Sequence, residues 1–142
     1  MIDIFIPGEP DRTTAQEKGV TVKRSRTGKF YVHFYHKPEV KRAINKLMNQ
    51  IYPYKPEEPF EGPVAVSIMW CFGRGSKSKK YIGRFKDTKP DLDNLSKNLL
   101  DIMTKLNFWK DDGQVSVLIL RKYWVEDERA GIKITIDDSL ET

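Results

Sequence analysis

Cysteine is nearly absent from this sequence, since Cys71 is the only one among 142 residues. A single cysteine excludes an intramolecular disulfide and a cysteine-rich zinc site, so we expect a reduced, intracellular compartment. Cys71 falls in an expected strand, where an inert core position is the simplest role. Histidine is scarce as well: His33 and His36 are three residues apart in an expected strand, hence on opposite faces, which argues against shared metal ligation.

Long apolar runs are also missing. No run approaches the roughly 20 residues that a membrane-spanning helix needs, so no membrane partner is expected. The opening MIDIFIPGEP carries an acid at position 3 and no basic region before its apolar residues, which predicts a strand rather than a signal peptide. A hydrophobic content of 39% and a charged content of 32% exclude a disordered chain. With no internal repeat, residues 1–142 are expected to form one domain.

The formal net charge is +5, and it is unevenly distributed. The chain ends in an acidic tail over residues 136–142, where DDSLET holds three acids and no base. Residues 1–136 therefore carry 25 basic against 17 acidic groups, or +8. This excess favours an anionic partner, with nucleic acid the first candidate, although charge alone does not identify one.

Apolar periodicity predicts a mixture of strands and helices. Strands are expected over residues 2–6, 30–36, 64–72, 115–124 and 132–136. Helices are expected over residues 38–52 and 93–106, and the four prolines between 53 and 63 predict a stiff connector. Residues 9–29 are polar and are expected to be irregular. The predicted fold class is α/β (α+β), a single domain with a mixed β-sheet packed by two main helices.

Two aspartates, Asp91 and Asp93, flank one leucine where the second helix begins, in KPDLDNLSKNLLDIM. Pro90 favours an extended entry, and residues two apart in an extended segment point the same way. Both carboxylates would then face one small volume, which favours a bound cation; oxygen ligands suit Mg²⁺ or Mn²⁺. Lys97 lies one turn after Asp93 on the same face. The plainer alternative is a capping aspartate with an ion pair at four-residue spacing, in which Lys97 also bridges to Asp101.

A second acidic pair, Asp111 and Asp112, follows in NFWKDDGQ. The helix carries the chain roughly 20 Å away at about 1.5 Å per residue. Residues 107–112 return roughly 20 Å if they are extended at about 3.3 Å each. The two pairs therefore meet only if this segment runs back along the helix, with Phe108 and Trp109 packed on it. The alternative is a solvated turn before the next strand.

Together, KPDLDNLSKNLLDIM and FWKDDGQV resemble the RusA family of Holliday-junction resolvases, small endonucleases common in phages and prophages. The resemblance is sharpest over residues 89–115 and extends through 115–124. It implies a homodimeric α/β fold, the cytoplasm of a bacterial or phage-infected cell, and Mg²⁺-dependent cleavage of four-way DNA in recombination and repair. One departure is PGEPDRTTAQEKG, because family members often carry a basic run with prolines soon after the first strand. Here the bases come later, at residues 23–29.

Carried over residue by residue, the resemblance assigns the catalytic and metal-binding carboxylates to Asp91, Asp93 and Asp112, and the catalytic lysine to Lys97. Asp111 stays an alternative third carboxylate, since either member of a tandem pair can turn inward. The carboxylates would hold Mg²⁺, or Mn²⁺, to activate water for in-line attack, while Lys97 would steady the phosphate. The expected products carry 5′-phosphate and 3′-hydroxyl ends.

The basic loop, residues 74–89, leads directly into these carboxylates and holds seven bases and one acid. Its expected DNA-contacting residues are Lys77, Lys79, Lys80, Arg84, Lys86 and Lys89. Tyr81 and Phe85 are interleaved with them and are suited to stacking on unpaired bases. The alternative is a flexible, solvated hairpin.

Two other functions fit the same residues. A non-catalytic DNA-binding protein with this fold would keep the basic loop, although its carboxylates would repel DNA unless a metal intervened. A branched-DNA nuclease of wider specificity has the same composition as a resolvase. Two matched cuts in a four-way junction require two sites, which favours a homodimer. Strands 64–72 and 115–124 are candidates for its interface, or belong to the core.

Overall fold

Four strands form one mixed sheet in the computed structural model, which describes residues 1–13 and 18–140. The strand order is β1 (Ile2–Pro7), β6 (Gly131–Asp137), β4 (Val64–Gly73) and β5 (Val115–Val125). β6 is antiparallel to both β1 and β4, whereas β4 and β5 are parallel. The parallel pair requires a crossover, which contains helix α2 (Leu92–Lys105).

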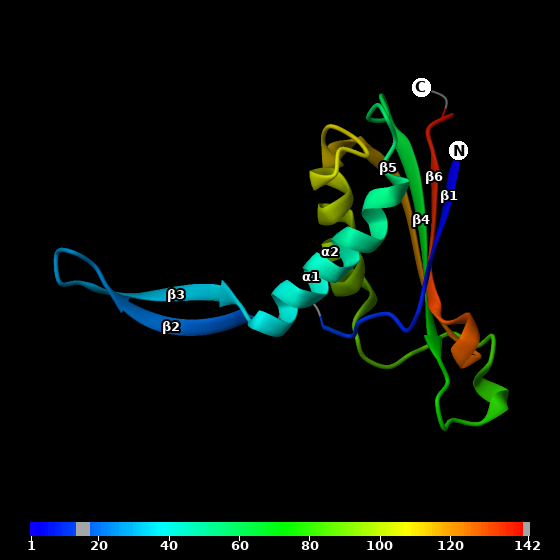
Figure 1. Ribbon diagram of the computed structural model, residues 1–142, viewed down its shortest axis with the longest axis horizontal. Helices are drawn as coiled ribbons and strands as arrows, with labels where there is room; N and C mark the ends of the chain where they lie inside the picture. The colour runs from blue at the N-terminus through cyan, green and yellow to red at the C-terminus, as the bar shows by residue number, and fades with distance from the viewer. Residues whose placement is uncertain (14–17, 141–142) are drawn as a thin grey trace.

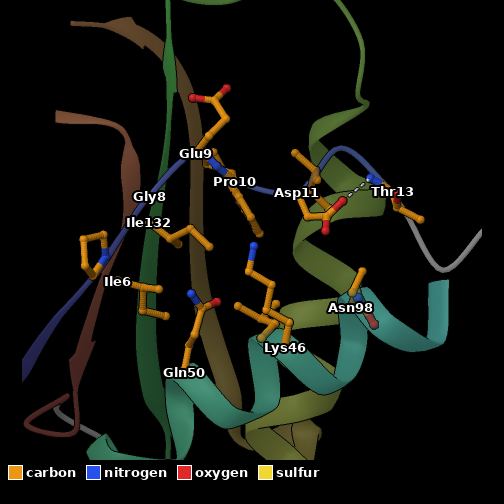
Figure 2. A pocket seen from close by; sticks show the side chains of 15 residues that line it. Ile6, Gly8, Glu9, Pro10, Asp11, Thr13, Lys46, Gln50, Asn98 and Ile132 are labelled. Carbon is orange, nitrogen blue, oxygen red and sulfur yellow. Dashed lines mark hydrogen bonds between the residues drawn. The ribbon is translucent and has the colours of Figure 1, made fainter. Parts of the chain in front are cut away.

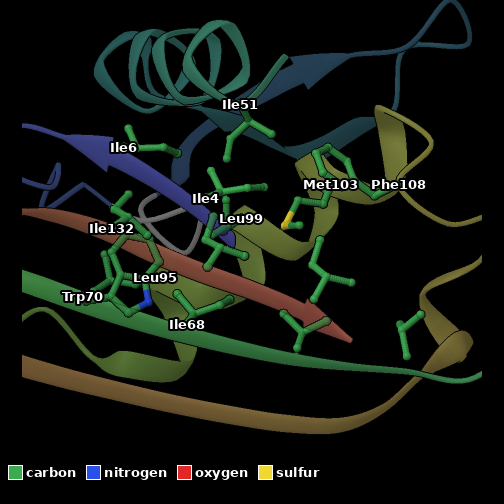
Figure 3. Close-up of a cluster of buried hydrophobic side chains, with 14 of the residues drawn as sticks. Ile4, Ile6, Ile51, Ile68, Trp70, Leu95, Leu99, Met103, Phe108 and Ile132 are labelled. Atoms are coloured by element: carbon green, nitrogen blue, oxygen red, sulfur yellow. The ribbon is translucent and has the colours of Figure 1, made fainter. Parts of the chain in front are cut away.

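Helix α1 (Pro38–Ile51) and helix α2 cover the same face of the sheet (Figure 1). Between helices and sheet lies one core, part of which Figure 3 shows, with Ile68 and Trp70 of β4 facing Leu99 and Met103 of α2. Alternate residues of β4 point into this core. Those between them lie on the opposite face, where all but the buried Cys71 are half-buried. The carboxylates of α2 therefore lie on the side of the helix that does not contact this core.

The apolar periodicity of α2 fixes how the helix is rotated. Its buried side chains are Leu95, Ser96, Leu99, Ile102 and Met103, which fall on one stripe. Ser96 is the polar exception: its hydroxyl oxygen accepts a 2.9 Å hydrogen bond from the Trp70 indole N–H, and both side chains are buried. The opposite stripe, with Asp93, Lys97 and Asp101, is exposed.

Most expected elements are present within two residues of their predicted ends, including both helices and the mixed sheet. Short 3-10 turns add detail in the connectors, namely η1 (Tyr52–Tyr54), η2 (Lys79–Tyr81), η3 (Asp112–Gln114) and η4 (Asp127–Arg129). No helix in the described ranges is long and apolar enough to cross a membrane. Cys71 is buried in β4, and burial raises the pKa of its thiol.

One strand was not expected. Residues 18–24 form β2 (Lys18–Arg24), which pairs with β3 (Phe30–His36) to make a separate two-stranded ribbon that projects beyond the N-terminus of α1 (Figure 1). Glycine and basic residues obscure the short alternation around Val20 and Val22, so the prediction of an irregular segment was wrong there. Residues 14–17 of that segment lie outside the described residues, as do the side chains of Lys18 and His36 and the last two residues of the acidic tail.

The Trp70–Ser96 bond generates a stability prediction. Ser96→Ala leaves the buried indole N–H without an acceptor, which should lower the free energy of unfolding by about 1–3 kcal/mol in urea titrations. Trp70→Phe/Ser96→Ala removes both partners, so its loss should be clearly smaller than the sum of the two single losses. Additive losses would show that the bond contributes nothing.

Candidate active site

The entry to α2 presents its two aspartates differently. Asp91 occupies the N-cap position in an extended conformation, but its side chain makes no capping hydrogen bond. Its carboxylate instead lies 3.2 Å from the ammonium of Lys89, in an exposed ion pair. Asp93 lies in the first turn of the helix and is exposed. The alternative of an aspartate that caps the helix with its side chain is therefore not observed at Asp91.

Lys122 of β5 holds this entry in place. Its ammonium donates hydrogen bonds to the carbonyl oxygens of Thr88, at 2.6 Å, and Pro90, at 2.8 Å. Burial lowers the pKa of Lys122, and the nearby carboxylates of Asp91 and Asp87 partly offset that effect. The edge strand of the sheet thus fixes the backbone directly before the carboxylates. Sequence analysis missed this residue, because nothing in the pattern of β5 distinguishes its lysine from a solvated one.

Residues 107–112 return along α2, as the reach estimate required. Asn107 turns the chain with a positive φ of 61°, and Phe108 and Trp109 are fully buried in the core. The indole N–H of Trp109 donates a 2.8 Å hydrogen bond to the hydroxyl of Thr104, in the last turns of α2. The segment is therefore a packed return path and not a solvated turn.

The two aspartates that end this segment have separate roles. The Asp111 carboxylate accepts from the backbone N–H of Gly113 at 3.3 Å and caps the turn η3. Gln114 completes this capping box and donates to the carbonyl oxygens of Phe60 and Gly62, which ties the turn to the connector before β4. With Asp111 engaged in its own turn, Asp112 is the member of the pair that faces α2.

A cleft of about 570 Å³ lies between α2 and β5. Asp93, Lys97 and Asp101 line it from the helix, and Asp112 lines it from η3. Its apolar wall includes Leu118 and Leu120 of β5, while Asn94, Ser96, Leu100 and Val115 complete the lining. Three carboxylates from two chain segments thus share one open volume with one lysine.

Neighbouring carboxyl groups shift the pKa of one of the aspartates in this cleft. The pKa of Asp112 is raised, first by a hydrogen bond with the Asp111 side chain, then by the charge of Asp111, and in smaller part by partial desolvation and by the charge of Asp101. Lys97 forms no ion pair with Asp93 or Asp101 among the described residues, although both lie four positions away. The alternative of an ion pair at four-residue spacing is therefore not realised.

The structure brings together three of the four predicted site residues. Asp93, Lys97 and Asp112 line the cleft, whereas Asp91 does not, because its carboxylate is turned to Lys89. Asp101 also lines the cleft, although the sequence suggested it only as an ion-pair partner of Lys97. Its position eight residues after Asp93, on the same exposed stripe, could have indicated this place. Within the described ranges, no three metal-ligating side chains are close enough to hold an ion as they stand.

The basic loop is folded against β5. The segment 83–86 pairs with the end of that strand, because the N–H groups of Lys86 and Trp124 donate to the carbonyl oxygens of Lys122 and Arg84. Phe85 stacks on Tyr123, with ring centroids 4.7 Å apart. The alternative of a flexible, solvated hairpin does not describe this loop. Five of its predicted DNA-contacting residues are exposed, namely Lys77, Lys79, Lys80, Arg84 and Lys89.

Lys86, the sixth predicted DNA contact, is an exception. Its side chain is only 4% exposed, and its ammonium lies 4.3 Å from the ring centroid of Trp124 and donates to the hydroxyl of Thr88. Burial lowers the pKa of Lys86 to about 8, and the nearby cations Arg12, Lys122 and Lys77 add to the effect. The prediction of a surface phosphate contact was wrong here, because the apolar stem and cation–π contacts anchor this lysine under the loop.

A second, smaller cavity of about 100 Å³ lies on the other side of α2 (Figure 2). Residues 6–11 and Thr13 line it together with Lys46 and Gln50 of α1 and Asn98 of α2. None of the predicted site residues reaches it. The candidate active site is therefore the cleft between α2 and β5.

Comparison with known proteins identifies the family of this chain. The family model described as endodeoxyribonuclease RusA matches residues 8–137. The chain belongs to the RusA family. A curated relative, named crossover junction endodeoxyribonuclease rusA, from Lactococcus phage r1t, is 37% identical over 128 residues, which cover 89% of each chain. The resemblance that the motifs carried is confirmed, and this RusA-family chain is a nuclease that cleaves DNA internally.

The buried Lys86 predicts an unusual pH dependence of stability. Below about pH 8 its ammonium is charged in the folded and unfolded chain, so its burial destabilises the fold. Between about pH 8 and 10.5 the folded chain releases this proton while the unfolded chain retains it, so stability should rise by on the order of 2–3 kcal/mol. Lys86→Met should lack this rise in urea titrations at pH 7.5 and 10.5, whereas the exposed control Lys79→Met should keep it. Equal pH dependence in Lys86→Met and the wild type would refute the assignment.

Proposed function

We propose that this chain is a divalent-metal-dependent nuclease that resolves four-way DNA junctions by paired, symmetric nicks. The cleft between α2 and β5 carries this proposal, since it presents Asp93, Asp112 and Lys97 to one open volume. The family membership and the name of the phage relative support the reaction class. Branched DNA is the proposed substrate, with 5′-phosphate and 3′-hydroxyl ends as products.

The donor set fits a hard divalent cation. Carboxylate oxygens with no thiolate or imidazole among them suit Mg²⁺, with Mn²⁺ as the alternative. The pKa of Asp112 is raised first by its hydrogen bond with the Asp111 side chain and then by the charges of Asp111 and Asp101, and a bound cation would offset the effect of those charges. Asp93 and Asp112 would hold the ion. Asp91 would join them by leaving its exposed ion pair with Lys89. When bound, the cation would neutralise charge on the scissile phosphate and lower the pKa of water.

The chain's own residues would orient the DNA. Lys97 is exposed and unpaired with its helix neighbours, so its ammonium is free to contact a phosphate oxygen at the cleft. Lys122 keeps the backbone before Asp91 fixed while the phosphate enters. The exposed cations of the basic loop precede the carboxylates in the chain and would bind the backbone of the arm that approaches the cleft.

We also propose a homodimer, because two matched cuts require two sites. Of the two strands considered for an interface, β4 lies between β6 and β5 and has no free edge. β5 is the edge strand, and the basic loop pairs only with its end. Earlier in β5, Val117, Leu118 and Ile119 are exposed. An edge strand that pairs with a second copy would need such exposed residues.

The separate roles of the tandem aspartates predict opposite results for two similar variants. Asp112→Asn should lower the rate of junction cleavage in Mg²⁺ by more than about 100-fold, because it removes a metal ligand. Asp93→Asn should do the same while folding and junction binding persist. Asp111→Asn is the matched control: asparagine caps as well as aspartate, so its rate should stay within about tenfold of the wild type. Loss of activity in Asp111→Asn alone would reverse the assignment.

A substrate comparison tests the function itself. Purified chain is incubated with a labelled four-way junction or a matched linear duplex, in Mg²⁺ or in EDTA. Symmetric paired nicks in the junction, in Mg²⁺ only, are expected. Equal cutting of forks and flaps would indicate the branched-DNA nuclease of wider specificity. Binding without cleavage in any divalent metal would instead indicate a non-catalytic DNA-binding protein.

A further inference from the structure

The β2–β3 ribbon is the largest feature that the cleft does not explain. It stands apart from the four-stranded sheet and projects from the body at the start of α1 (Figure 1). An isolated two-stranded ribbon is marginally stable in water, so a surface-exposed ribbon of this length calls for a binding partner. Lys37 alone separates β3 from α1, so the ribbon is closely coupled to the helix layer.

Antiparallel register divides the ribbon into two faces. Directly opposite residues share a face, which places Val20 with Phe34 and Val22 with Val32 on an apolar face. Lys23 with Tyr31, and Thr21 with His33, lie on a polar face. The polar face carries aromatic contacts: the rings of His33 and Tyr35 stack at 6.2 Å, and the Tyr35 ring covers Gly19 so closely that a Cβ at this position would require the ring to shift.

The tip of the ribbon is a defined turn that presents cations. The N–H of Ser25 donates to the carbonyl oxygen of Lys29 at 2.8 Å, and Gly28 adopts a positive φ of 85°. This is the three-residue hairpin loop in which glycine takes the left-handed position. Arg26 and Lys29 are exposed on it. The turn therefore holds positive charge at the tip of the projecting ribbon.

Charge is the strongest clue to the partner. Residues 18–37 contain six lysines and arginines and no aspartate or glutamate. None of the ion pairs found in the described residues involves Lys23, Arg24, Arg26 or Lys29. A ribbon with unneutralised cations fits a polyanion. A second copy of this chain, with its net charge of +5, fits it poorly.

Size agrees with charge. Seven residues at about 3.3 Å each give a ribbon about 23 Å long, and two strands that each occupy about 4.8 Å make it about 10 Å wide. One face then offers roughly 230 Å², well below the about 800 Å² per partner of a stable protein interface. The major groove of B-DNA, about 12 Å wide, admits a two-stranded β-ribbon. The apolar face alone is thus too small for a dimer contact, whereas the ribbon as a whole matches a duplex groove.

We propose that the polar face and tip of the β2–β3 ribbon bind a duplex arm of the DNA substrate, outside the cleft that holds the scissile phosphate. This inference rests on the proposed function for its substrate class. Lys23, Arg26 and Lys29 contact phosphates, and Thr21, Tyr31 and His33 face the groove with hydrogen-bonding groups. The ribbon holds an arm rather than the branch point, so its contribution applies to linear duplex as well as to junctions.

The test is a charge-neutralising variant, Lys23→Gln/Arg26→Gln/Lys29→Gln. It leaves Arg24 in place, because its guanidinium lies over the Phe30 ring, 5.8 Å from the centroid. The matched control, Lys55→Gln/Lys105→Gln/Lys133→Gln, removes the same charge from exposed positions outside the ribbon. Binding to a 20-bp duplex and to a four-way junction is measured by fluorescence anisotropy in EDTA across a salt series. Circular dichroism and light scattering confirm that each variant is folded and record its molar mass.

The ribbon variant should bind both DNAs at least about tenfold more weakly at 100 mM salt, and the slope of log K against log salt should fall by about 2 to 3. The control should stay within about threefold of the wild type. Equal losses in the two variants overturn the proposal, and so does an effect confined to junctions. A changed molar mass with an unchanged salt slope assigns the ribbon to a contact between copies instead.

Cleavage is assayed separately in Mg²⁺, so the two proposals fail independently. If the wild type resolves junctions and the ribbon variant binds like the control, the ribbon inference is wrong and the nuclease function stands. If binding depends on the ribbon in a chain that cuts no branched DNA, the function is wrong and the ribbon inference stands. An unmodified chain that binds neither DNA overturns the inference as well.

Discussion

Burial of Trp109 against α2 is the contact on which the candidate site depends. The helix moves the chain away from Asp93, and only a packed return along the helix brings Asp112 back to it. Trp109 supplies apolar area, and its indole N–H reaches Thr104. Phe108 is equally buried. Its carbonyl oxygen accepts a hydrogen bond from the N–H of Phe60, which links the returning segment to the connector before β4. A hydrophobic contact thus places the carboxylate of Asp112 in the same cleft as that of Asp93.

This chain is basic overall but places three carboxylates in one cleft. The cleft suits a cation, and the basic surface around it suits a polyanion. The carboxylates of the cleft disfavour DNA by themselves, and the surrounding lysines and arginines favour it. β5 separates these roles: its inner face lines the cleft, Lys122 holds the helix entry, and its end anchors the basic loop. Lys86 stays beneath that loop as a structural cation, in contact with Trp124, rather than as a DNA contact.

Much of this arrangement follows from the sequence, because long apolar periods leave little choice. The burial stripe of α2 determines that Asp93 and Lys97 face outward, and the reach of residues 107–112 determines where Asp112 can lie. Other features depend on partners far away in sequence. Gln114, which contacts Phe60 and Gly62, ties the turn that Asp111 caps to the connector before β4. Trp124 covers the ammonium of Lys86, and the aromatic residues of β3 pair with a β2 whose own pattern is too short to detect.

We propose that the cleft between α2 and β5 holds the divalent cation of this RusA-family nuclease. The decisive measurement is a calorimetric titration of Mg²⁺ into the DNA-free chain, with Asp112→Asn and Asp111→Asn alongside. We expect saturable binding to the wild type and to Asp111→Asn, and at least about a tenfold loss of affinity in Asp112→Asn. Equal affinity in all three chains would contradict it.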